Sequence, residues 1–161
     1  MVNLSVKRKV WFGTILGLVI FLFLVIKLGK LEKAELVDLN NSNNFVELMR
    51  VVDGDTIEVK MGDKVESIRL IGIDAPEMNE ETMERAIESK QYLENLLKNQ
   101  KIYLEKDETQ DDRDVYNRLL RYVYLRDRTL INKKMIEADM ADEYTFIHPY
   151  KYQREFKEAE E

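Results

Sequence analysis

The sequence predicts a small α+β domain, a five-stranded barrel with about three helices, preceded by one transmembrane helix. Three observations lead to this prediction. Short segments alternate between apolar and polar residues and are separated by turn signals, as in antiparallel sheet. Segments with helical spacing of apolar residues follow them. One long apolar run stands near the N-terminus. A chain of 161 residues has room for one such domain.

The N-terminal segment predicts a membrane anchor. Val10–Ile26 is an unbroken apolar run with no polar face, and it is just long enough to span a bilayer together with Leu28. No convincing small-x-small cleavage site follows it, so we favour an uncleaved signal-anchor over a removed signal that would leave a secreted domain. The basic residues Lys7–Lys9 favour a cytoplasmic N-terminus, which places the domain on the extracytoplasmic side.

The chain divides into three predicted parts: a basic flank and anchor (1–30), a polar tether (31–44) and the barrel domain (45–161). The net charge is −6, but residues 1–33 hold six Lys or Arg against one Glu, so the remainder carries −11. An acidic domain does not attract nucleic acid through its overall charge. A polyanionic substrate would therefore need a local arginine cluster and a bound cation. The chain has no cysteine, which excludes disulfides and thiolate metal sites.

The barrel prediction comes from five segments of β-prone residues: Phe45–Val52, Thr56–Met61, Ile68–Ile73, Lys101–Glu105 and Leu119–Leu125. Helical spacing predicts one helix over Glu77–Asn99, with Pro76 at its start, a second from Thr129 to about Ala138, and a third from near Pro149. Five strands in a meander, with one helix after the third and helices at the end, describe an oligonucleotide/oligosaccharide-binding (OB) fold. The polar segment 107–114 is interpreted as a solvated connection.

Acidic residues stand at the ends of the predicted strands. Asp55 lies in an Asp-Gly-Asp-Thr turn before the second strand, and Asp74 follows the third. If the first three strands form a meander, both carboxylates lie at the same edge and form a hard-oxygen site suited to Ca²⁺. Each feature alone also has a purely structural explanation, because Asp-Gly turns are common and a strand arginine often forms a cross-strand ion pair.

The combination is more specific than its parts. Asp-Gly-Asp-Thr (53–56), followed by R-L-x-G-I-D-x-P-E (69–77), resembles the staphylococcal nuclease (thermonuclease) family, and the resemblance covers roughly residues 45–161. It implies an OB-fold nuclease, expected to be a monomer, that uses Ca²⁺ to hydrolyse phosphodiester bonds of DNA and RNA and leaves 3′-phosphate ends. It also implies that Asp55 and Asp74 are metal ligands, together with the backbone carbonyl of Ala75.

The same resemblance implies roles for four further residues. Arg69 and Arg118 match the two arginines that bind phosphate, Glu77 matches the acid thought to activate the attacking water, and Tyr116 matches a tyrosine that contacts the phosphate. Tyr144 and Phe146 lie where the family presents aromatic rings to bases. The alternative is a catalytically inactive barrel that binds nucleic acid or protein at the membrane. The presence of all five acidic and arginine positions favours the enzyme.

The sequence departs from the family pattern at two glycine positions, which are Asn117 and Asp139 here. Asn and Asp tolerate left-handed backbone better than other side chains do, so both turns are expected to survive. His148, the single histidine, precedes a proline and is expected to be a loop residue.

Overall fold

The computed structural model describes residues 20–22, 25 and 45–161. The predicted tether and nearly all of the predicted signal-anchor lie outside these residues. Within the described ranges, no helix is both long enough and apolar enough to cross a membrane.

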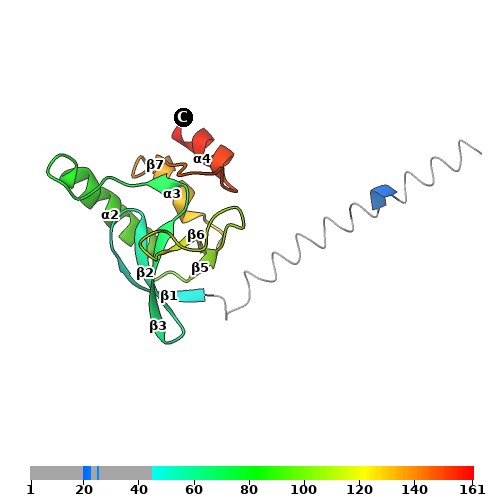
Figure 1. Ribbon diagram of the computed structural model, residues 1–161, viewed down its shortest axis with the longest axis horizontal. Coiled ribbons are helices and arrows are strands. Elements are labelled where there is room, and N and C mark those ends of the chain that lie inside the picture. The colour runs from blue at the N-terminus through cyan, green and yellow to red at the C-terminus, as the bar shows by residue number, and fades with distance from the viewer. Residues whose placement is uncertain (1–19, 23–24, 26–44) are drawn as a thin grey trace, which may run out of the picture. The chain divides into compact units, whose positions relative to one another are not determined.

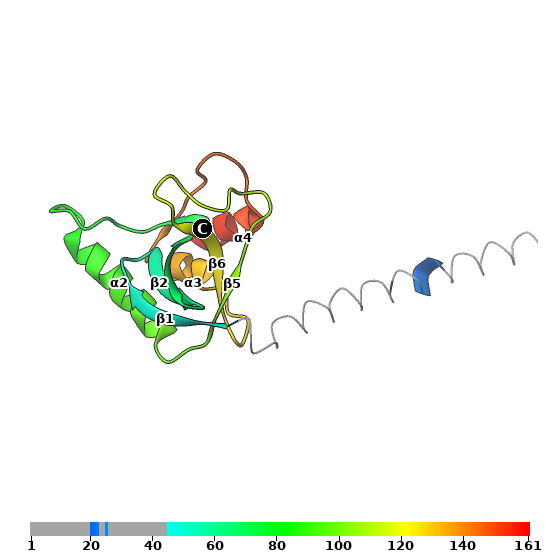
Figure 2. The ribbon, with the colours of Figure 1, turned by 60° about the horizontal axis from the view of Figure 1, so that its bottom comes forward.

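The domain is built on a closed barrel of five strands, as predicted. These are β1 (Phe45–Val51), β2 (Thr56–Met61), β3 (Lys64–Leu70), β5 (Ile102–Glu105) and β6 (Leu119–Leu125), in the order β1-β2-β3-β6-β5 (Figures 1 and 2). The first three strands form the predicted antiparallel meander. The prediction that the meander continues through all five strands is wrong, because β6 pairs with β3 in parallel and antiparallel with β5.

The third strand is divided where the sequence predicted a continuous one. β3 ends at Leu70, and Ile73–Asp74 form a separate strand, β4, which pairs with β7 (Asp142–Glu143). Gly72 lies between them in the left-handed region, with φ +80°. A Cβ at Gly72 would lie 2.6 Å from ring atoms of Tyr150, so only glycine fits there. This turn redirects the chain toward Asp74.

Three helices follow the predicted order but are shorter: α2 (Met83–Leu97), α3 (Ile131–Glu137) and α4 (Gln153–Glu160). The predictions that the first helix begins at Glu77 and that Pro76 marks its start are wrong. Asn79 explains the delay, because its side-chain oxygen accepts hydrogen bonds from the backbone N–H groups of Glu81 and Thr82. This local turn competes with helix formation. The third helix also begins later than predicted, after a turn at 150–152.

The core fills the barrel and extends beneath the C-terminal helices. Tyr122 of β6 is fully buried, and its ring packs edge-on against Tyr152, with ring centroids 4.7 Å apart, and also against Phe156 of α4. Asn132 attaches α3 to the barrel, since its side chain accepts from the Val123 N–H (2.9 Å) and donates to the Ile71 carbonyl (2.8 Å). The two bonds satisfy a polar side chain that is entirely buried.

The loop 107–114 is only in part the solvated connection that its composition predicted, since Glu108, Thr109, Asp111 and Asp112 are exposed but Asp107 is buried. Asp107 is 2% exposed and accepts hydrogen bonds from the Tyr122 hydroxyl (2.6 Å), the Thr109 N–H and hydroxyl (2.8 and 2.7 Å) and the Lys151 N–H (2.9 Å). Burial alone would raise the pKa of Asp107, but these donors together hold it below its usual value. The loop is therefore fastened to both β6 and the turn before α4.

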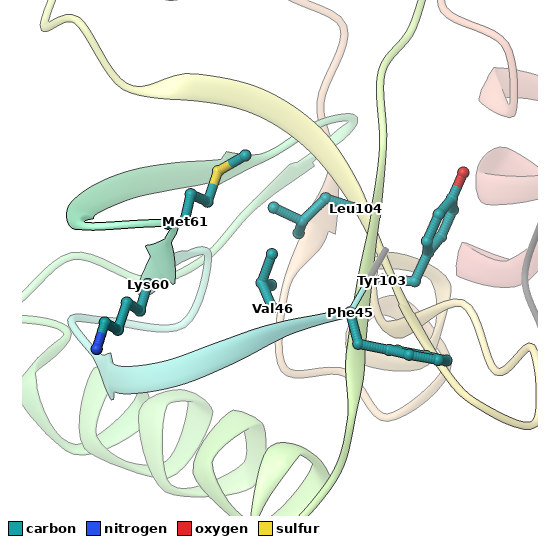
Figure 3. A pocket seen from close by; sticks show the side chains of 7 residues that line it. Phe45, Val46, Lys60, Met61, Tyr103 and Leu104 are labelled. Atoms are coloured by element: carbon teal, nitrogen blue, oxygen red, sulfur yellow. The ribbon is translucent and has the colours of Figure 1, made fainter. Parts of the chain in front are cut away.

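A hollow of about 620 Å³ opens at the far end of β2 from Asp55. It is lined by side chains of β1, β2 and β5. Figure 3 shows the side chains of Val46, Met61 and Leu104 around the hollow, with the Lys60 side chain pointing away from it. None of the residues predicted to act in a site lines this hollow.

Candidate active site

The pairing of β2 with β3 brings the two predicted metal carboxylates to one end of the barrel. The guanidinium of Arg69 lies between them, with Nη2 3.2 Å from Oδ2 of Asp55 and 2.9 Å from Oδ1 of Asp74. Its Nη1 donates to the backbone carbonyls of Leu70 (2.9 Å) and Ile73 (2.7 Å). These contacts fix the arginine on the turn between β3 and β4. The two aspartates thus share one edge, as the predicted meander requires.

Asp55 is the buried member of this cluster. It is 7% exposed, its Oδ1 accepts from the Thr56 hydroxyl (2.9 Å), and its Oδ2 accepts from the Ala75 N–H (3.0 Å). Burial is the main reason why the pKa of Asp55 is raised. The nearby charge of Asp53 also raises it, while Arg69 and the Ala75 N–H oppose the shift. The negative charge of Asp55 is thus incompletely compensated by the protein.

Gly54 is required in the Asp-Gly-Asp turn by close packing. A Cβ at this position would lie 1.9 Å from Oγ of Ser89 in α2 and 2.6 Å from Cβ of Ala75. The turn therefore lies directly against α2, which holds the loops of both aspartates together. The sequence pattern showed the turn but not this contact, because Ser89 carries no signal of its own in a helical segment.

Arg118 reaches the same region from the loop before β6. Its Nε contacts Oδ2 of Asp114 at 2.6 Å, and its Nη1 donates to the Thr56 hydroxyl at 3.2 Å. The ring of Tyr116, which is 78% exposed, lies 5.4 Å from the guanidinium carbon of Arg118. Sequence reasoning missed Asp114 and Thr56. Thr56 was part of the Asp-Gly-Asp-Thr motif without a role of its own, and Asp114 had no signal beyond its place near Tyr116 and Arg118.

Glu77 lies apart from the two aspartates. It is exposed, in the loop between β4 and α2, and its backbone carbonyl accepts from the Thr82 hydroxyl. Within residues 45–161, no three His, Cys, Asp or Glu side chains lie close enough together to hold a metal ion. The structure therefore gathers Asp55 and Asp74 around Arg69, joins Ala75 to Asp55 through its N–H, and leaves Glu77 on the adjoining loop.

The donor set still fits a hard divalent cation. Two carboxylates and the Ala75 carbonyl offer oxygen ligands, which suit Ca²⁺ or Mg²⁺ rather than Zn²⁺. Because Asp55 is buried and has few donors, a further positive charge beside its carboxylate would stabilise the charged form. A cation would share the carboxylates with Arg69.

The structure also describes the two aromatic residues and the two glycine replacements that the sequence analysis singled out. Tyr144 donates its N–H to the Gly72 carbonyl (3.0 Å), and its ring lies 6.3 Å from that of the exposed Phe146. Asn117 and Asp139 have φ values of +66° and +57°, which confirms the prediction of left-handed backbone at both positions. The departures from glycine thus leave the two turns intact.

Comparison with known proteins agrees with this geometry. A family model described as staphylococcal nuclease homologue matches residues 67–161. The thermonuclease of Staphylococcus hyicus is 34% identical over 126 residues, which cover 76% of this chain and 73% of the relative. The thermonuclease of Staphylococcus intermedius is 35% identical over 95 residues (57% and 55%). The SPbeta prophage-derived endonuclease YokF of Bacillus subtilis is 33% identical over 119 residues, which cover 72% of this chain but 40% of YokF.

Proposed function

The chain belongs to the staphylococcal nuclease family, and we propose that it is a calcium-dependent nuclease that hydrolyses phosphodiester bonds of DNA and RNA to 3′-phosphate ends. The observation that carries this proposal is the Asp55–Arg69–Asp74 cluster at the barrel end, with Arg118 attached to it through Thr56. Two carboxylates and two arginines lie in one place, which supports the binding of a cation and of a phosphate there.

The two arginines would bind and stabilise the phosphate. A guanidinium presents a planar fork of donors that matches phosphate oxygens, which a lysine does not reproduce. Arg69 is fixed by two backbone carbonyls and two carboxylates, and Arg118 is held by Asp114. Fixed donors stabilise the charge that develops on the phosphate oxygens without reorganising during the reaction.

The remaining roles fall to Glu77, Tyr116 and the metal ligands. The exposed Glu77 carboxylate is free of the Arg69 cluster, and we assign it the removal of a proton from the attacking water. The Tyr116 hydroxyl would donate to a phosphate oxygen, with its ring against Arg118. Asp55, Asp74 and the Ala75 carbonyl would hold Ca²⁺, which when bound polarises the phosphate.

The test is hydrolysis by the full chain of single-stranded DNA and of RNA, with millimolar calcium or with chelator. We expect cleavage only with calcium, and products whose 3′ ends become extendable only after phosphatase treatment. Equal cleavage in chelator would contradict the calcium requirement, and directly extendable 3′ ends would contradict the product assignment. Binding of nucleic acid without hydrolysis would instead favour the inactive binding module.

We further propose that Val10–Ile26 anchors the enzyme in the cell membrane, with the domain outside the cytoplasm. The support is the sequence alone: an unbroken apolar run after three basic residues. Protease added to intact cells should abolish the membrane-bound activity. Survival of that activity, or full-length protein in the soluble fraction, would contradict the topology. A shortened protein in the medium would favour secretion after cleavage.

A further inference from the structure

The hydroxyl of Thr56 lies between the acidic cluster and the second arginine. Thr56 is the first residue of β2, is 3% exposed, and is paired in register with Arg69 of β3. Its Oγ1 lies 2.9 Å from Oδ1 of Asp55 and 3.2 Å from Nη1 of Arg118. A single buried oxygen therefore contacts both the carboxylate expected to bind metal and the guanidinium expected to bind phosphate.

The direction of these two hydrogen bonds is fixed by chemistry. A guanidinium has donors only, whereas an ionised carboxylate has acceptors only. The hydroxyl must therefore accept from Arg118 and give its one proton to Asp55. The resulting chain runs from guanidinium to hydroxyl to carboxylate, and hydrogen bonds in such chains strengthen one another.

We propose that Thr56 is a positioning residue that couples Asp55 to Arg118, so that the phosphate-binding arginine is held in register with the metal-binding end of the barrel; this rests on the proposed function. Arg118 lies 62 positions from Thr56 in the chain. Its ion-pair partner, Asp114, belongs to the same loop as Arg118 itself. The hydroxyl of Thr56 is the contact that ties this guanidinium to β2.

The side chain is well suited to this role. A β-branched residue in a strand has a restricted χ1, so the hydroxyl is directed with little freedom. Loss of the hydroxyl would deprive Oδ1 of Asp55 of a donor and Nη1 of Arg118 of an acceptor. Valine keeps the shape and removes the hydroxyl, whereas serine keeps the hydroxyl and removes the methyl group.

The experiment compares Thr56→Val and Thr56→Ser with the wild-type full chain, using single-stranded DNA in saturating calcium. We expect Thr56→Val to lower kcat by about tenfold with a smaller change in KM, and Thr56→Ser to recover activity to within about threefold of wild type. Ser89→Ala is the matched control. Its hydroxyl is also fully buried and close to the Asp-Gly-Asp turn, yet it has no hydrogen-bond partner among the described residues, so activity should be unchanged.

A double-mutant cycle tests the coupling itself. In an Arg118→Ala background, Thr56→Val should lower turnover by less than about twofold, because the link it would break is already absent. An equal tenfold loss in both backgrounds would overturn the coupling, as would wild-type kcat in Thr56→Val. If Thr56→Val does not fold, Thr56→Ala takes its place in the cycle, since it removes the hydroxyl without burying a second methyl group.

The same cycle, measured on the free energy of unfolding in chelator, separates this inference from the proposed function. A wild-type chain that hydrolyses no nucleic acid would refute the nuclease proposal. Non-additive unfolding free energies for Thr56→Val and Arg118→Ala would still support the link between Asp55 and Arg118. Additive values would overturn the link even in an active nuclease.

Discussion

Two buried aspartates, Asp55 in the candidate site and Asp107 between β6 and the turn before α4, differ in how fully their charges are compensated. Asp107 accepts four hydrogen bonds, two of them from backbone N–H groups, one on each carboxylate oxygen. Asp55 accepts one from a backbone N–H and one from a hydroxyl, and it shares Arg69 with Asp74. The pKa of Asp107 is lowered and that of Asp55 is raised.

The difference separates a carboxylate whose charge is compensated by the protein's own donors from one that leaves room for a positively charged ligand. A buried carboxylate surrounded by donors stabilises the fold in its charged form. A buried carboxylate with too few donors is destabilising when charged, unless a ligand supplies the missing positive charge. The two aspartates therefore predict opposite responses to mutation, metal and pH.

The largest expected effect is on turnover at the site. Arg69→Ala and Glu77→Gln should each lower kcat by at least about a hundredfold, because each removes a group that we propose acts in the transition state. Arg121→Ala is the matched control. Arg121 is also held by its neighbour's carbonyl and by an aspartate, Asp112, but outside the cluster. Near-normal turnover in Glu77→Gln would contradict its assignment as the base.

The second effect is on stability at Asp107. In Asp107→Asn, the new NH₂ group must face a backbone N–H whichever way the amide is turned, because Thr109 N–H and Lys151 N–H point at different oxygens. We expect a loss of about 3 kcal/mol in the free energy of unfolding, measured by urea denaturation. Turnover per folded molecule should not change. Asp112→Asn, in an exposed ion pair of the same loop, should cost less than about 1 kcal/mol.

The third effect is stabilisation by calcium. Binding to the folded form alone should stabilise the protein by about 2.7 kcal/mol at a hundred times the dissociation constant. Asp55→Asn should lose most of this gain, while Asp107→Asn should keep it because Asp107 lies in a different region. Melting curves with chelator and with millimolar calcium give the comparison. Equal calcium shifts in wild type and Asp55→Asn would mean that Asp55 is only a turn residue.

The smallest effect concerns Asp55 without metal. Asn at this position can accept from Ala75 N–H and donate to the Thr56 hydroxyl, so Asp55→Asn should melt at or above the wild-type temperature in chelator. The difference should be below about 1 kcal/mol. A clearly lower melting temperature would mean that the charge of Asp55 is fully compensated.

The stability difference between the wild type and Asp55→Asn should depend on pH, because the pKa of Asp55 is raised in the folded state. The folded state takes up the proton more readily than the unfolded state, whose Asp pKa is about 3.9. In chelator, the wild type should therefore gain stability relative to Asp55→Asn as pH falls through the folded pKa, and the gain should level off below about pH 4.

The pH dependence expected for Asp107 is opposite. Because the pKa of Asp107 is lowered in the folded state, the stability that its charge contributes is lost as pH falls through that folded pKa.

The sequence by itself predicted most of the barrel strands, the placing of two aspartates at one edge and the left-handed turns. β-prone segments predicted β2 and β6 at their observed bounds, and the motif spacing predicted Asp55 and Asp74 at one edge. Asn117 and Asp139 adopt the left-handed backbone that their residue types favour. These features depend on interactions within a few residues, or on the pairing of neighbouring strands, which local patterns encode.

Only the tertiary structure decided the parallel pairing of β3 with β6 and the identity of each buried carboxylate's partners. Asp107 stands in a segment as polar as any solvated loop, yet it accepts a hydrogen bond from the N–H of Lys151, 44 positions away. Thr56 meets Arg118 across 62 positions. Only glycine fits at position 72, because the ring of Tyr150, 78 positions away, occupies the space that a side chain would need. Such contacts join segments that are distant in the sequence. The polarity pattern of one segment does not say which hydrogen-bond donor a distant segment will bring to it in the folded protein.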